Sequence, residues 1–364
     1  MRRFLIHTAI LAGIAAIGAV LVVWLGLFNV SARSGHLPGV SWVLHTTFRN
    51  AVELRAPPAD AVPDLSDPDL VALGARHYDG ACRVCHAGPD EGRTATMLSM
   101  LPAPPPIKEA VADWEPQHLF WIVKHGVKMS GMPAWPTRTR DDDVWPVVAF
   151  LTRVPEMTLA EYEELVAPPE LPADAAGADV AYCASCHGAD GRGRGNAQVP
   201  RLDILGEAYI AASLTAYRTG ARQNGIMHHA ASTLDATGDA RLARFYGAQQ
   251  PSPASDPQSD SEPGGKRDHI TLGRDLAMGS AASADVPACS ACHGPWPDRL
   301  SALFPRLAGQ PEPYLLRQLE LWRDGERGGT SRAHLMHQAA KDLTDGELRA
   351  LAAYYASLKP GEAR

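Results

Sequence analysis

The six cysteines constrain this chain of 364 residues more than any other feature. They form three pairs with the spacing Cys-x-x-Cys, and a histidine follows each pair directly. The three sets are Cys82, Cys85 and His86; Cys183, Cys186 and His187; and Cys289, Cys292 and His293. Cys-x-x-Cys-His is the attachment signal for c-type haem, in which the thiols bond to the two vinyl groups and the histidine becomes an iron ligand. The sequence therefore predicts three covalently bound haem c groups.

A single Cys-x-x-Cys pair has two other common uses, as a redox-active dithiol and as half of a zinc site. Both are disfavoured here because all three pairs carry the histidine. No cysteine is left over to complete a zinc site or to form a structural disulfide. In an oxidising compartment, spare cysteines would be paired or modified. The three-haem interpretation accounts for every cysteine.

A long apolar run near the N-terminus predicts export. Residues 4–28 contain no Asp, Glu, Lys or Arg, and about 20 apolar residues suffice to cross a bilayer. Arg2 and Arg3 precede the run, which is typical of a cytoplasmic N-terminus. We expect a single-pass anchor in the cytoplasmic membrane with the remaining chain on the periplasmic side. The alternative is a cleaved signal peptide, with a weak cleavage site at residues 30–32.

The segment after the anchor, residues 31–65, is expected to lie next to the membrane. Residues 36–56 mix apolar residues with arginines, and two interpretations stay open. The segment is either an amphipathic helix at the membrane surface or a short helix packed on the first domain.

Three similar domains follow from the motif spacing, because the first cysteines of the pairs lie 101 and 106 residues apart. The acidic, proline-rich stretch 156–172 is expected to be a solvated linker. The stretch 249–268 is rich in Pro, Ser, Asp and Gly and is expected to be disordered, so that the third domain moves on a tether. The expected division is 1–30 anchor, 31–65 juxtamembrane segment, 66–155 first domain, 156–172 linker, 173–248 second domain, 249–268 linker and 269–360 third domain.

The periodicity of apolar residues predicts helices and no strand, and therefore an all-α fold. The clearest helix covers residues 344–358, where Thr344 and Glu347 form a capping box. Further helices are expected at 69–80, 142–151, 159–166 and 238–248. The overall charge of −7 excludes a general nucleic-acid binder.

The second and third domains are duplicates, and the duplication points to the sixth ligand of the iron. Residues 200–202 and 305–307 are both Pro-Arg-Leu, and Met227 corresponds to Met336 after a four-residue insertion. Thioether sulfur is the sixth ligand in electron-carrying cytochromes c and raises the reduction potential. We expect Met227 and Met336 to be these ligands. In the first domain Met132, followed by proline, is the better candidate.

Histidine ligation is the rival interpretation. His228, His229 and His337 directly follow the proposed methionines, and a second histidine ligand would lower the potential. The alignment of the methionines in the duplicated domains favours His–Met ligation.

The second and third domains resemble the small bacterial diheme cytochromes of the c-four type. The matching segments are Cys-Ala-Ser-Cys-His-Gly-Ala-Asp-Gly at 183–191, Pro-Arg-Leu-Ala-Gly-Gln at 305–310 and Leu-Arg-Ala-Leu-Ala-Ala-Tyr-Tyr at 348–355. The first domain resembles a class I cytochrome c domain with a Gly-Met-Pro-Ala ligand loop. The resemblance implies three all-helical class I cytochrome c-like domains after one transmembrane helix.

The resemblance also implies a proline carbonyl that accepts a hydrogen bond from each proximal histidine and orients its ring. In the duplicated domains these prolines are Pro200 and Pro305. In the first domain the run 102–106 leaves the residue open. The long segment 249–268 departs from the diheme pattern, in which the two domains pack closely.

These expectations describe an electron relay without catalytic residues. It would pass single electrons between a respiratory donor and acceptor, with a terminal oxidase preferred as acceptor and a soluble redox protein as a further partner. The alternative is the cytochrome subunit of a membrane-bound dehydrogenase complex. A haem peroxidase-like enzyme would need an iron without a stable sixth ligand, and each domain holds a suitable methionine. A ligand sensor would need an output domain, and none is recognisable.

Overall fold

The computed structural model describes residues 1–172, 177–252, 265–280, 287–294 and 301–360. Within these ranges the chain is helical and contains no strand, apart from one isolated antiparallel bridge between Arg222 and Gly328. The predicted all-α fold is therefore confirmed.

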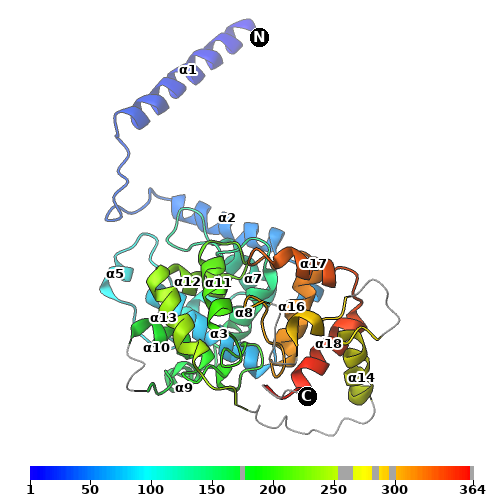
Figure 1. Cartoon of the computed structure of the whole chain (residues 1–364). Helices are drawn as coiled ribbons and strands as arrows, with labels where there is room; N and C mark the ends of the chain where they lie inside the picture. Colours follow the sequence, from blue (N-terminus) through cyan, green and yellow to red (C-terminus); the bar gives the residue numbers. More distant parts are fainter. Residues whose placement is uncertain (173–176, 253–264, 281–286, 295–300, 361–364) are drawn as a thin grey trace.

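Helix α1 (Arg2–Trp24) is long and apolar enough to cross a membrane. It has 23 residues, and an 18-residue stretch of it has a mean hydropathy of 2.4, with none of that stretch buried against the rest of the protein. It projects away from the body that the other helices form (Figure 1). The expected apolar helix is present, and its length and composition also suit a signal sequence.

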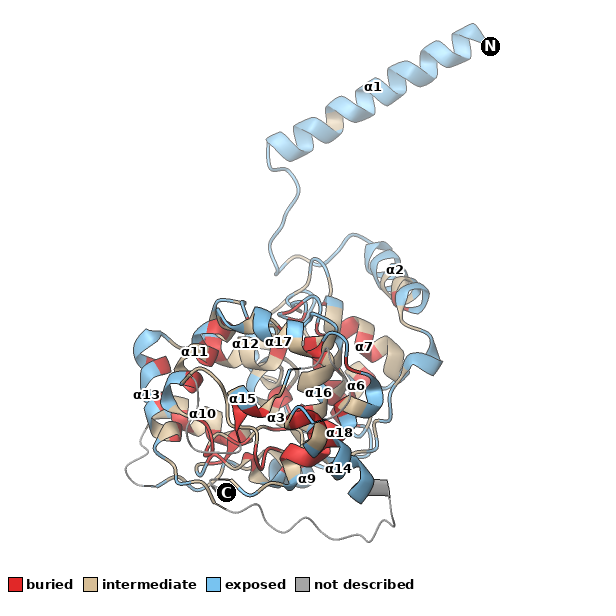
Figure 2. Cartoon of the chain, turned by 45° about the vertical axis from the view of Figure 1, so that its right-hand side comes forward, coloured by how far each residue is buried: buried red, intermediate tan, exposed pale blue. Residues whose placement is uncertain are grey.

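Helix α2 (Val40–Arg55) combines parts of both interpretations of the juxtamembrane segment. In its second half Val52 is completely buried, and the ring of Phe48 lies 5.6 Å from that of Trp114 in the first domain. Residues 42–44 in its first half, Trp-Val-Leu, are exposed. The helix therefore packs on the first domain and leaves apolar side chains exposed in its first half. It lies at the edge of the body, with much of its length exposed (Figure 2).

The first domain is built on α3, which packs against α8 and α9. Its helices are α3 (Pro68–Ala81), α4 (Arg83–His86), α5 (Ala95–Leu98), α6 (Ile107–Val111), α7 (Pro116–His125), α8 (Trp145–Leu151) and α9 (Leu159–Val166). Gly74 lets α3 approach α8 closely, because a Cβ there would lie 1.8 Å from the carbonyl oxygen of Pro146. The rings of Tyr78, Phe150 and Tyr162 meet in the buried core.

Part of the segment expected as a solvated linker belongs to this core. Helix α9 forms at the expected residues and begins with a capping box between Thr158 and Glu161. The acidic side chains around Tyr162 suggested a solvated stretch, yet Tyr162 itself is completely buried against α3. One aromatic side chain on an otherwise polar helix is enough to dock it.

The duplicated domains each surround one buried cluster. The second domain contains α10 (Ala178–His187), α11 (Glu207–Arg218), α12 (Gly225–Ser232) and α13 (Ala236–Gly247). The third contains α14 (Gly265–Ala277), α15 (Ser290–His293), α16 (Glu312–Arg323), α17 (Ala333–Ala340) and α18 (Asp345–Ser357). The predicted capping box of Thr344 and Glu347 is present at the start of α18.

The third domain is in direct contact with the second, which differs from the expectation of a loosely tethered domain. The side-chain amide of Gln310 bonds to both backbone groups of Arg201, with N···O distances of 2.9 and 2.8 Å. Two backbone hydrogen bonds cross the same interface, from Gln223 to Arg327 and from Gly329 to Ala221. Residues 253–264 of the expected linker lie outside the described residues, and its last four residues open α14. Linker composition carries no information about the surfaces that the linker joins.

Candidate haem centres

Each histidine of the Cys-x-x-Cys-His motifs is oriented by a proline carbonyl. A carbonyl oxygen only accepts, so Nδ1–H is the donor and Nε2 keeps the lone pair that binds a metal. The Nδ1···O distances are 2.8 Å for His86 and Pro105, 3.2 Å for His187 and Pro200, and 2.9 Å for His293 and Pro305. Pro105 is the residue that the sequence left open within the proline run of the first domain.

Burial keeps these imidazoles neutral. His187 and His293 are almost completely buried, and burial lowers the pKa of His187 to about 4. Burial also lowers the pKa of His86 and of His293. The neutral ring is the form that binds iron, so the three side chains are ready to act as ligands at neutral pH.

A tyrosine fixes the chain just after each motif, a feature that we did not predict. Its hydroxyl donates to the carbonyl oxygen of the residue that follows the histidine. The pairs are Tyr78 and Ala87, Tyr246 and Gly188, and Tyr355 and Gly294, with O···O distances of 2.5, 3.1 and 3.3 Å. Tyr246 and Tyr355 occupy equivalent positions in the duplicated domains, so the alignment offered a signal for them. Tyr78 comes from a different helix, α3, and no local pattern marks it.

The methionines are positioned differently in the three domains. In the third domain Sδ of Met336 lies 3.3 Å from Nε2 of His293, across the buried cluster that also contacts Cys289. Met227 packs against the equivalent cluster of the second domain together with Cys183. Met132 is half-buried, and its carbonyl accepts a hydrogen bond from Val127. Within the described residues, no hydrogen-bond contact joins Met132 to His86 or Met227 to His187.

Two of the rival histidines bond to the backbone. Nδ1 of His228 lies 2.7 Å from the carbonyl oxygen of Tyr217, and Nδ1 of His337 lies 3.0 Å from that of Trp322. The two bonds are equivalent in the duplicated domains. The third, His229, has its ring 5.7 Å from that of His77 in the first domain.

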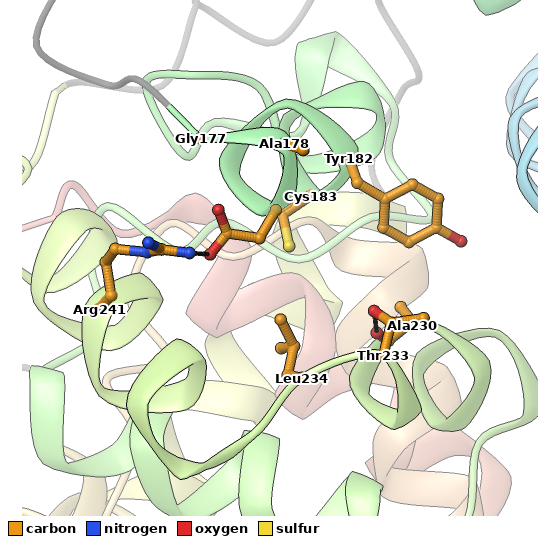
Figure 3. Close-up of a pocket in the computed structure, with 9 residues that line it drawn as sticks. Gly177, Ala178, Tyr182, Cys183, Ala230, Thr233, Leu234 and Arg241 are labelled. Atoms are coloured by element: carbon orange, nitrogen blue, oxygen red, sulfur yellow. Dashed lines mark hydrogen bonds and ion pairs between the residues drawn. The ribbon is translucent and has the colours of Figure 1, made fainter.

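A cavity lies beside Cys183, the first cysteine of the second motif. Its volume is about 480 Å³, in the size range of small-molecule sites. Tyr182, Leu234 and the ion pair of Asp179 and Arg241 help to line it (Figure 3).

Buried polar groups show whether the residues fit a ring with acidic edges. In the first domain Trp135 Nε1 and Thr137 Oγ1 are buried without a hydrogen-bond partner among the described residues. Between the other two domains, the guanidinium groups of Arg222 and Arg327 are buried and both donate to Tyr209 and Gln318, and no carboxylate in the described part of the chain forms an ion pair with them. Buried donors and charges normally have partners. The propionates of a haem would supply an acceptor for the two unpartnered donors of the first domain and a counter-charge for the two arginines, so the residues fit the cofactor.

Comparisons with known proteins agree with this geometry. Residues 69–151 match the family described as cytochrome C oxidase, cbb3-type, subunit III, and residues 175–259 match the cytochrome c family. A protein named thiosulfate dehydrogenase electron acceptor, from Thiomonas intermedia (strain K12), is 35% identical over 183 residues, covering 50% of this chain and 81% of that protein. The chain belongs to the c-type cytochromes.

Two further relatives of this cytochrome support the assignment. The thiosulfate dehydrogenase electron acceptor of Stutzerimonas stutzeri (strain A1501) is 37% identical over 177 residues, or 48% of this chain and 78% of that protein. Cytochrome c4 of Azotobacter vinelandii is 28% identical over 189 residues, or 49% of this chain and 85% of that protein. The protein is thus a triheme c-type cytochrome with cytochrome c4-like domains, three covalently attached haem c groups and a role in electron transfer rather than catalysis.

In this cytochrome the first domain also packs directly on the second. The backbone amide of Ala197 donates to the carboxylate of Asp69 at 2.7 Å. Trp135 lies so close to Gly225 that a Cβ on the glycine would be 2.0 Å from its indole nitrogen. The described parts of the three haem domains therefore form one connected assembly.

Proposed function

We propose that this triheme cytochrome accepts electrons from a dehydrogenase that oxidises thiosulfate and delivers them to a terminal oxidase of the membrane. The observation that carries the proposal is the 35–37% identity to two proteins named as electron acceptors of thiosulfate dehydrogenase. Haem supplies reversible one-electron chemistry. The protein supplies ligands, burial and fixed contact between the haem domains.

The oxidase is the preferred acceptor because of the first domain. Its residues 69–151 match the family described as subunit III of cbb3-type cytochrome C oxidase. An arrangement in which the c4-like pair faces the dehydrogenase and the first domain faces the oxidase agrees with both similarities. The second candidate is a permanent cytochrome subunit of the dehydrogenase complex, which the names of the relatives also favour.

We propose His–Met ligation for each iron. The ligand pairs are His86 and Met132, His187 and Met227, and His293 and Met336. The third pair has the strongest support, since its nitrogen and sulfur are already 3.3 Å apart. Thioether ligation raises the potential, which suits delivery to an oxidase.

We also propose that α1 stays attached and anchors the haem domains on the periplasmic side. The exposed Trp42 and its neighbours on α2 would then lie at the lipid surface, where tryptophan is enriched. The first domain, on which α2 packs, would be the domain nearest the membrane. Anchoring raises the effective concentration of the cytochrome at a membrane acceptor.

The test uses membrane vesicles that contain the full chain, a purified thiosulfate dehydrogenase and thiosulfate. The cytochrome should become reduced, and an inhibitor of the terminal oxidases should block its reoxidation by oxygen. If the haems stay oxidised, the dehydrogenase is not the donor. If reoxidation persists with every terminal oxidase inhibited, the acceptor is another component. Stable co-purification of the two proteins would instead favour the subunit candidate.

A further inference from the structure

A carboxylate of the first domain holds the start of the helix that carries Met227 in the second. Asp143 is only 6% exposed, and its two oxygens accept from Asn224 Nδ2 at 2.6 Å and from the backbone amide of Gly225 at 2.8 Å. The guanidinium of Arg140, itself 3% exposed, donates to Asp143 at 2.7 Å. Charge-assisted hydrogen bonds of this kind are short and strong.

Asn224 connects Asp143 to the methionine, because its side chain bonds to both residues. It is the N-cap of α12, and its side-chain oxygen accepts from the backbone amide of Met227 at 2.7 Å. Gly225 and Met227 are the first and third residues of the helix. The backbone amides at these positions have no acceptor within the helix. Asp143 and Asn224 therefore satisfy both, and the carboxylate also lies at the positive end of the helix dipole.

The backbone at this point accepts no larger residue. Trp135 of the first domain occupies the space where a Cβ of Gly225 would lie. Arg140 also donates to the backbone carbonyl of Gln223, just before the cap. Three side chains of the first domain thus contact three consecutive residues, 223–225, that precede Met227.

The described part of the third domain has no counterpart of this support. Its equivalent helix, α17, carries Met336 and begins after Arg332, which makes no side-chain cap. The two duplicated domains therefore differ in how their methionine-bearing helices begin. Among the described residues, a carboxylate of the first domain reaches the start of this helix in the second domain only.

We propose that Asp143 is a positioning residue for Met227, through which the first domain sets the ligation and potential of the second haem relative to the third. The proposal rests on the proposed role of Met227 as ligand. Residues that orient a metal ligand tune the metal, and a loosened thioether would bind iron more weakly and lower the potential. Packing of the first domain would thus adjust the haem of the domain that it contacts.

The test measures the methionine-to-iron charge-transfer band and the three haem potentials in the full chain. Asn224→Ser keeps a capping oxygen but lacks the amide that reaches Asp143, and it changes no charge. We expect it to lower the second potential and to remove up to one third of the band. Asp143→Asn should also weaken the band. In the double variant the band loss should be smaller than the sum of the two single losses, because both changes break the contact between Asp143 and Asn224.

The matched control is Asp69→Asn, which removes another carboxylate from the same interface but none from α12. It should leave the band and the second potential unchanged. Met227→Ala separates the two proposals: an intact band would refute Met227 as ligand. If Met227→Ala removes one third of the band while Asn224→Ser and Asp143→Asn leave it unchanged, Met227 is supported as the ligand. The positioning role of Asp143 is then refuted. Additive losses in the double variant would also refute that role.

Discussion

The docking of the third domain on the second can be tested at Gln310. This side chain is 3% exposed, and it satisfies both the amide and the carbonyl of Arg201 across the interface. Gln310→Ala leaves these two backbone groups buried without partners. Each unsatisfied group costs about 1–3 kcal/mol, so the closed interface should lose about 2–6 kcal/mol. If the free energy of docking the two domains is smaller than this cost, the domains separate instead. The loss of interface stability is then limited to the docking free energy.

Hydrogen exchange at the amide of Arg201 reports this loss directly. In the native protein that amide exchanges only when the interface opens, since Gln310 is its acceptor. A loss of 2 kcal/mol corresponds to roughly 30-fold faster exchange. Gln198→Ala is the control, because Gln198 bonds across the other interface, to Asp67 at 3.1 Å. Equal exchange rates in Gln310→Ala and the unchanged protein would refute docking through this contact and would revive the tethered domain.

Three further predictions concern the haem domains themselves. A pyridine haemochrome assay should give three haems per chain, and two or fewer in mature protein would contradict the use of every cysteine. Tyr246→Phe removes the hydrogen bond to Gly188 and should cost about 1 kcal/mol of stability in denaturant unfolding, whereas no change would mean that the bond contributes nothing. Burial, helped by His229, lowers the pKa of His77 to about 3. Only the unfolded chain then binds this proton, so stability should fall as the pH drops below 6.5, by up to about 1.4 kcal/mol per pH unit. His77→Gln should flatten that dependence, and an unchanged slope would refute the assignment.

Local chemistry explains what the sequence could predict. The Cys-x-x-Cys-His motifs, the capping box at Thr344 and the helices at 69–80 and 344–358 depend on residues a few positions apart, and the structure contains them all. The contacts of Pro200 and Pro305 with the histidines came from the family resemblance, and the structure shows the same contacts.

Contacts between domains could not be predicted in this way. Asp143 and Asn224 lie 81 residues apart, and neither belongs to a motif. A buried carboxylate gives no periodic signal, and its partner resembles any other helix N-cap. For the same reason the composition of 249–268 suggested a free third domain, although the surfaces of Gln310 and Arg201 bind each other. Such pairs are set by tertiary packing.

The proposed relay is tested most directly by following the haem absorbance of the full chain in oxygen-consuming membrane vesicles after thiosulfate and its dehydrogenase are added. The account predicts that all three haems are reduced, that oxygen reoxidises them, and that removing the cytochrome stops thiosulfate-dependent oxygen uptake. Uptake that continues at the same rate without the cytochrome would contradict its role as the carrier between dehydrogenase and oxidase.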